Sequence, residues 1–86
     1  MQTWWHKSKY LRELYNSDDA EALFGKDLKG NHTPLGDVYK IEASEKWKAI
    51  YYHRQHVEAI FETKEDAEAF LKTLVIGDLD VLMFEI

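Results

Sequence analysis

Cysteine is absent from this 86-residue chain. Its absence excludes disulfide bridges, cysteine-ligated zinc sites and thiol chemistry. Long apolar runs are also missing, and a bilayer-spanning helix needs about 20 consecutive apolar residues. Near the start, Trp4 and Trp5 lead at once into His6 and Lys7, which is unlike the apolar core of a secretory signal. We therefore expect a cytoplasmic protein that does not enter a membrane.

The chain does contain enough apolar material for a small core. Hydrophobic residues make up 45% of the sequence and aromatic residues 14%. This content can offset the conformational entropy that is lost on folding. A length of 86 residues leaves no room for two domains. We expect residues 1–86 to form a single folded domain.

Acidic residues outnumber basic residues by sixteen to eleven, which gives a net charge of -5. The acidic side chains gather mainly in residues 16–24 and 57–70. Such a field repels phosphate backbones, so it disfavours nonspecific nucleic-acid binding and favours basic partners.

Three segments alternate apolar and polar residues, which is the pattern of strands with one buried face. They are residues 37–43, 47–53 and 56–62, and we expect them to form an antiparallel meander. The side chains expected to face a helix are Tyr39, Ile41, Trp47, Ala49, Tyr51, Val57, Ala59 and Phe61. Residues 79–86 are nearly all apolar and are predicted to add a C-terminal strand to the same sheet.

One amphipathic helix is predicted over residues 64–75. Thr63 is suited to cap it, with Asp66 in the place of the usual capping-box glutamate. The apolar stripe of this helix consists of Ala67, Phe70, Leu71 and Leu74. Gly77 is expected to end the helix.

Two shorter helices are predicted before the sheet. Apolar spacing favours a helix over residues 3–15, although alternation within residues 9–16 leaves a strand open there. Ser17 and the two aspartates after it predict the start of a second helix, which would run to about residue 24 and end at Gly25. The segment 26–36 is rich in glycine and turn residues and is predicted to be a loop.

These elements predict an α+β fold, in which a three-strand meander plus a C-terminal strand is packed by the helix over residues 64–75. Residues 66–71 (DAEAFL) nearly repeat residues 19–24 (DAEALF). A duplicated unit would favour a ferredoxin-like plait as the alternative. Acidic first turns with alanine are also common helix starts, so the repeat does not decide between them.

No catalytic, metal-binding or cofactor-binding motif is present. His53 and His56 lie three residues apart, but they flank a predicted turn and have no third ligand at motif spacing. The paired carboxylates fall in predicted helix first turns or just after a helix end. Phosphate loops, nucleophile elbows and zinc-binding helices are absent from the sequence. We expect a protein that is not an enzyme and uses no cofactor.

The function favoured by these features is protein binding. An adaptor or an inhibitor of this kind would present carboxylates to a basic groove on a partner protein. The carboxylates predicted to do so are those of Asp18, Asp19, Glu21, Glu65 and Glu68. The sequence does not determine the partner's identity or the oligomeric state.

The outer face of the sheet is the alternative binding surface. Its predicted residues are Lys48, Ile50, Tyr52, Arg54 and Ile60. Aromatic and basic side chains also alternate on sheets that bind RNA or single strands, so a nucleic-acid-binding domain is the alternative function. The N-terminal segment can instead fold over this face as a second layer, and the sequence leaves both arrangements open.

Overall fold

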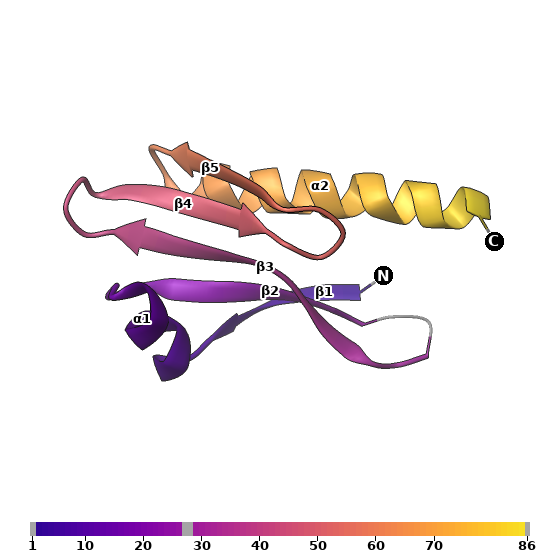
Figure 1. Cartoon of the computed structure of the whole chain (residues 1–86), viewed down its shortest axis with the longest axis horizontal. Helices are drawn as coiled ribbons and strands as arrows, with labels where there is room; N and C mark the ends of the chain where they lie inside the picture. The colour runs from indigo at the N-terminus through magenta and orange to yellow at the C-terminus, as the bar shows by residue number, and fades with distance from the viewer. Residues whose placement is uncertain (1, 27–28, 86) are drawn as a thin grey trace.

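The computed structural model describes residues 2–26 and 29–85. The elements, in chain order, are β1 (Gln2–Lys7), α1 (Lys9–Tyr15), β2 (Ala20–Lys26), β3 (His32–Ile41), β4 (Lys46–Tyr51), β5 (Val57–Phe61) and α2 (Lys64–Glu85). The strands form one antiparallel meander sheet in the order β1-β2-β3-β4-β5. Figure 1 shows the long helix α2 packed along this sheet and the short helix α1 near the start of β2. The predicted α+β class is confirmed, and the order of the strands is not that of a ferredoxin-like plait.

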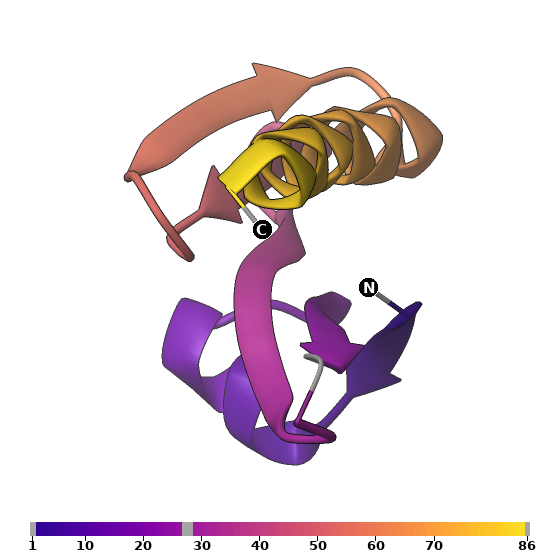
Figure 2. The same ribbon diagram turned by 90° about the vertical axis from the view of Figure 1, so that its right-hand side faces the viewer.

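The long strand β3 joins two halves of a strongly twisted sheet. In Figure 2, β4, β5 and α2 lie in the upper half of the view, and β1, β2 and α1 lie around the lower part of β3. The two helices lie on opposite faces, because Val38 packs with the α2 cluster and its neighbour Tyr39 packs with the α1 cluster.

The N-terminal segment contains a strand before its helix, so the predicted helix over residues 3–15 is wrong in its first half. Trp4 and Trp5 point to opposite faces of β1 and pair with Phe24 and Leu23 of β2. The Ser8 hydroxyl then caps α1 by accepting a hydrogen bond from the Leu11 N–H at 3.2 Å. The open alternative of a strand over residues 9–16 is also wrong.

The second predicted helix, ending at Gly25, does not form, because residues 20–26 are strand β2. Ser17 caps no helix there. Its hydroxyl donates to the Lys40 carbonyl oxygen at 2.7 Å and accepts from the Asp19 N–H at 3.2 Å. The strand is favoured because both of its faces are buried, with Ala20 and Ala22 toward α1 and Leu23 toward α2.

The predicted loop 26–36 is shorter than expected, since β3 begins at His32. Asp27 and Leu28 lie outside the described residues. A register shift beside Leu23 leaves Leu35 as an extra residue in β3, and Leu35 is buried in the α2 cluster. This bulge accommodates the one proline of the sequence inside a strand.

The face assigned to β3 was wrong by one residue. Val38 pairs with Ala49, and both side chains point toward α2. Tyr39 and Ile41 therefore lie on the other face, contrary to the prediction. The pattern misled because residues 37–43 carry apolar side chains on both faces. The predicted strands 47–53 and 56–62 correspond to β4 and β5, and Trp47, Val57 and Phe61 do pack against the α2 cluster.

The start of α2 is confirmed. The Thr63 hydroxyl accepts a hydrogen bond from the Asp66 N–H at 3.2 Å. The predicted stripe faces the sheet, with Ala67 and Leu71 fully buried and Phe70 and Leu74 partly buried.

Gly77 does not end this helix. Helix α2 continues to Glu85 and extends past the sheet in Figure 1. The predicted strand over residues 79–86 is therefore wrong through Glu85, and Ile86 lies outside the described residues. A glycine inside a helix costs only about 1 kcal/mol relative to alanine, so one glycine does not force an end. Among the described residues, no helix has the length and apolar character needed to cross a membrane.

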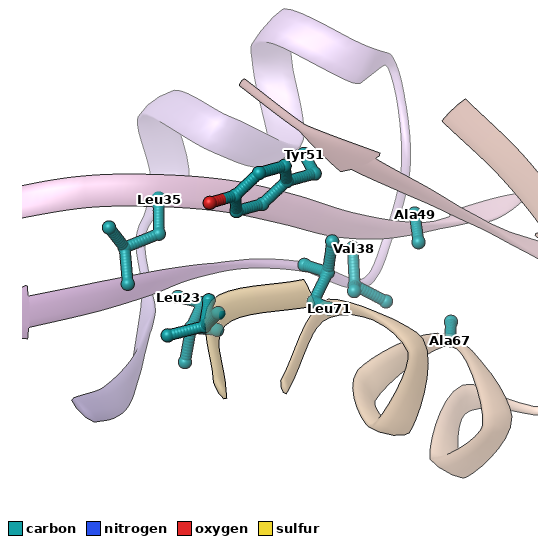
Figure 3. Close-up of a cluster of buried hydrophobic side chains, with 8 residues drawn as sticks. Leu23, Leu35, Val38, Ala49, Tyr51, Ala67 and Leu71 are labelled. Atoms are coloured by element: carbon teal, nitrogen blue, oxygen red, sulfur yellow. The ribbon is translucent and has the colours of Figure 1, made fainter. Parts of the chain in front are cut away.

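The main core lies between the sheet and α2 (Figure 3). It consists of Leu23, Leu35, Val38, Ala49, Tyr51, Ala67, Leu71 and Val75. Gly36 permits close packing here. A Cβ at this position would lie 2.5 Å from the Ile50 carbonyl oxygen and 3.1 Å from Leu71 Cδ1.

A smaller cluster lies on the opposite face under α1. It contains the buried Leu11, Ala20 and Ala22, packed by Tyr15, Phe24 and Tyr39. The Tyr15 and Tyr39 rings stack with their centroids 4.2 Å apart. Helix α1 covers the β2 side of this face but leaves Ile60 of β5 58% exposed. The N-terminal segment therefore covers one part of the outer face and leaves the other part exposed, so each of the two arrangements left open by the sequence holds for part of this face.

Candidate functional site

A hollow of about 430 Å³ opens on the sheet face opposite α2. Helix α1 and its cap Ser8 form one side of it, and residues of β1, β2 and β3 together with Tyr52, just after β4, form the remainder. Tyr10, Leu14 and Tyr52 line it, with 69%, 56% and 37% of their surfaces exposed. Asp37 also lines it and is only 5% exposed. Its volume falls within the range of small ligand pockets, and its combination of apolar rim and buried acid suits recognition.

Local structure explains why this space stays open. Asp37 of β3 pairs with Ala22 of β2, whose small side chain leaves room above the strands. Helix α1 is short because Ser8 caps its start and Asn16 ends it in the left-handed conformation, with φ at 50°. Leu11 anchors the helix in the smaller cluster, so Tyr10 and Leu14 remain exposed.

The Asp37 carboxylate accepts hydrogen bonds from two tyrosine hydroxyls. Tyr52 donates to Oδ1 at 2.9 Å, and Tyr15 donates to Oδ2. Burial raises the pKa of Asp37, and the two phenol hydrogen bonds partly oppose that rise. Burial and the nearby Asp37 also raise the pKa of both tyrosines above the ordinary value. The phenols therefore stay protonated and act as donors at neutral pH.

Asp37 has no basic partner among the described residues. Within the described part of the chain, no lysine, arginine or histidine forms an ion pair with its carboxylate. Positive side chains are also missing among the influences on its pKa, which are burial and the two tyrosines alone. Buried carboxylates are usually paired with a cation, so this one is unusual.

A second buried carboxylate, that of Glu21, lies on the α2 face of the sheet and is 3% exposed. Lys64 Nζ lies 3.9 Å from Glu21 Oε2 and 3.7 Å from Asp19 Oδ2. Lys7 Nζ lies 3.9 Å from Asp19 Oδ1. Burial and a hydrogen bond with Glu68 raise the pKa of Glu21 to about 8, while the charges of Lys64 and Lys7 oppose the rise.

This cluster changes the interpretation of the predicted acidic surface. Asp19, Glu21 and Glu68 are brought together around Lys64. Glu21 was predicted to be presented to a partner, but it is buried because it lies on a strand and points toward α2. Of the five predicted carboxylates, Asp18 and Glu65 are exposed.

The alternative patch on the outer face lies mainly on β4 and β5. Ile60 pairs with Lys48, and Ile50 pairs with Glu58. Lys48 Nζ lies 2.6 Å from Glu58 Oε1, and this contact raises the pKa of Lys48 and lowers that of Glu58. Arg54 is exposed after β4, outside the paired strands. Tyr52 lines the hollow, where its hydroxyl donates a hydrogen bond to Asp37.

The two histidines singled out by spacing do not converge on a third ligand. His56 Nε2 lies 2.6 Å from Glu58 Oε2. Burial and the charge of Arg54 lower the pKa of His53. In residues 2–26 and 29–85, no group of three histidine, aspartate or glutamate side chains is placed to hold a metal ion.

Sequence reasoning missed Asp37, Tyr15, Tyr10 and Leu14 as site residues. Asp37 was taken as the first residue of a strand, where an acid is exposed. The signal that could have found it is the apolar Leu35 two residues earlier, which extends the strand and places Asp37 in its interior.

No protein-family model, curated protein or solved structure matches this chain. The functional argument therefore depends on the geometry of the described residues.

Proposed function

We propose that this chain is a non-enzymatic interaction domain, an adaptor or inhibitor, that binds a partner protein through the α1 side of its sheet. The observation that carries the proposal is the exposure of Tyr10, Leu14 and Tyr52 around one hollow. Large apolar and aromatic side chains around a recess are typical of the centres of protein interfaces.

Charge supports a basic partner. The net charge of -5 would attract such a partner and repel nucleic acid. The binding surface differs from the predicted acidic one, since the carboxylate that lines the hollow is that of Asp37. Asp18 and Glu65 are exposed elsewhere and would add long-range attraction that falls as salt is raised.

The nucleic-acid alternative gains no specific support. Its central cation, Lys48, is matched by Glu58, and the hydroxyl of its aromatic residue, Tyr52, is bound to Asp37. Saturable binding of a single-stranded oligonucleotide at physiological salt would favour this alternative over protein binding.

The test uses a photoreactive phenylalanine analogue at position 10 in the full chain, added to a lysate of the native cells. A matched control carries the same group at Ile76 of α2, on the other face of the sheet. Specific crosslinks are those that excess unlabelled chain removes. We expect one defined crosslinked protein from position 10 and none from position 76.

A pair of charge substitutions completes the test. Leu14 and Ile76 are 56% and 58% exposed, so Leu14→Asp and Ile76→Asp should change the free energy of unfolding by similar amounts. Loss of apolar contact at Leu14 should weaken capture at least about tenfold, which corresponds to about 1.4 kcal/mol. Equal crosslinking from both positions, or unchanged capture by Leu14→Asp, would overturn the proposal.

A further inference from the structure

The carboxylate in the hollow has hydrogen bonds but no counter-charge from the residues that the structure describes. Asp37 is 5% exposed, and its hydrogen-bond partners among the described side chains are the neutral hydroxyls of Tyr15 and Tyr52. Glu21, buried to a similar degree, has Lys64 and Lys7 near it. Because an ionised carboxylate away from water is costly without a cation, Asp37 creates a site that favours an incoming positive group.

The arrangement of the two hydrogen bonds indicates the shape of that group. A carboxylate has about four acceptor positions, two on each oxygen. Tyr15 occupies one on Oδ2 and Tyr52 occupies one on Oδ1, so each oxygen keeps an acceptor position. A guanidinium group can donate two parallel N–H bonds, one to each oxygen, whereas an ammonium is a point charge without this fork.

The surroundings also suit a guanidinium. Tyr10, Phe24, Tyr52 and His6 line the hollow and supply aromatic surface. Guanidinium groups are weakly hydrated and stack on aromatic faces. A volume of about 430 Å³ accommodates such a side chain together with part of its neighbour in a chain.

We infer that the hollow receives an arginine side chain of the partner protein, with Asp37 as its acceptor. This inference rests on the proposed function and names the partner residue that the interface would bind. Binding would hold Asp37 ionised and supply the positive charge that this chain lacks there.

The first experiment titrates the ¹⁵N-labelled full chain with N-acetyl-arginine amide and follows the amide signals by NMR. We expect saturable shifts at hollow residues such as Ala22, Asp37 and Tyr52. N-acetyl-citrulline amide has the same shape without charge and should bind at least about tenfold more weakly. N-acetyl-lysine amide should also bind more weakly. Equal binding by citrulline, equal binding by lysine or an absence of saturable shifts would overturn the inference.

Guanidinium chloride at the same concentrations tests for a small-cation site. We expect this ion to bind more weakly than the arginine amide, because it lacks the apolar stem that the aromatic walls would contact. Binding as tight as that of the arginine amide would contradict docking of a side chain. Asp37→Asn should abolish arginine binding, and Asp18→Asn, at an exposed acid in another part of the chain, should leave it unchanged. If Asp37→Asn fails to fold, the citrulline comparison on the parent chain still decides the question.

The crosslinking assay separates this inference from the proposed function. A crosslinked protein that Leu14→Asp loses but Asp37→Asn retains would leave the interaction domain standing and remove the arginine contact. Arginine binding without any position-specific crosslink would leave the arginine site standing and remove the proposed protein-binding function.

Discussion

The sheet buries one carboxylate on each of its faces, and the two acids differ in the side chains that lie near them. Glu21 pairs with Val38, and Asp37 pairs with Ala22 in the adjoining row of β2 and β3. On the α2 face, lysines approach Glu21. On the α1 face, Asp37 accepts hydrogen bonds from two tyrosines and has no ion pair within the described part of the chain. Glu21 has cations of its own chain beside it, although burial still raises its pKa to about 8, whereas the hydrogen-bonded Asp37 remains available for an external cation.

The same contrast holds for the apolar side chains. The α2 face carries a cluster of eight buried residues, and the α1 face carries one of three. We therefore expect substitutions under α2 to affect mainly stability, and substitutions around α1 to affect mainly binding.

The largest effect is expected for Leu71→Ala, which removes a fully buried side chain from the main core. Such a change typically costs about 2–5 kcal/mol, and Leu11→Ala in the smaller cluster should lie near the lower end, about 2 kcal/mol. Urea unfolding followed by tryptophan fluorescence measures both. A larger loss of stability from Leu11→Ala than from Leu71→Ala would contradict the assignment of stability mainly to the α2 face.

The next largest effect is expected for Gly36→Ala. The new Cβ would meet the Ile50 carbonyl oxygen at 2.5 Å, and the backbone cannot give way as a flexible side chain can. Overpacking of this kind costs about 1–3 kcal/mol. Gly77→Ala is the control, because no atom lies within 4 Å of the added Cβ there, and it should not destabilise the chain. An equally stable Gly36→Ala chain would contradict the close approach of the β4 backbone to Gly36.

A pH effect of moderate size is expected from Glu21. Its native pKa of about 8 lies above the ordinary value of 4.5, so between these values the native state holds a proton that the unfolded chain has released. The free energy of unfolding should therefore fall as pH rises through this window. One pKa unit corresponds to about 1.4 kcal/mol, so the fall should be at least on that order.

Glu21→Gln tests this expectation, because glutamine resembles the protonated acid at every pH. The variant should match the parent near pH 4.5 and exceed it in stability at pH 8. His53 shifts stability in the opposite direction below pH 6.5, since its pKa is lowered, but it is common to both chains and cancels in the comparison. Parallel pH profiles of the two chains would refute the protonated Glu21.

The smallest effects are expected from two neighbouring tyrosines on opposite faces. Tyr52→Phe removes a donor to Asp37 and should cost about 1 kcal/mol. The Tyr51 hydroxyl is buried and has no hydrogen-bond partner among the described residues, so Tyr51→Phe should be neutral or stabilising. Thermal unfolding of both variants measures the difference, and the reverse order would be inconsistent with these contacts.

Much of the second half of the fold could be predicted from sequence. Alternation in β4 and β5 and the capped stripe at the start of α2 each point to one structure. The near-repeated hexapeptides show the limit, because DAEALF forms the start of β2 whereas DAEAFL lies in α2. Local propensity is similar for both, so packing on two faces, which short-range pattern does not encode, decides the outcome.

The candidate site was less predictable for a related reason. Its acid is supplied by β3, its donors by α1 and the end of β4, and its rim by α1. Only the register of β2, β3 and β4 brings these segments together. The one-residue error in the face of β3 was enough to place Asp37 incorrectly, because side chains alternate along a strand.

Every strand in this sheet bonds only to strands that precede or follow it in the chain. The loops that must close during folding are therefore short, and early closure costs little entropy. We expect refolding on the millisecond scale typical of mixed α/β domains with local topology, which stopped-flow fluorescence of the three tryptophans can record. A newly synthesised chain would then expose the apolar face of its sheet only briefly before α2 packs on it.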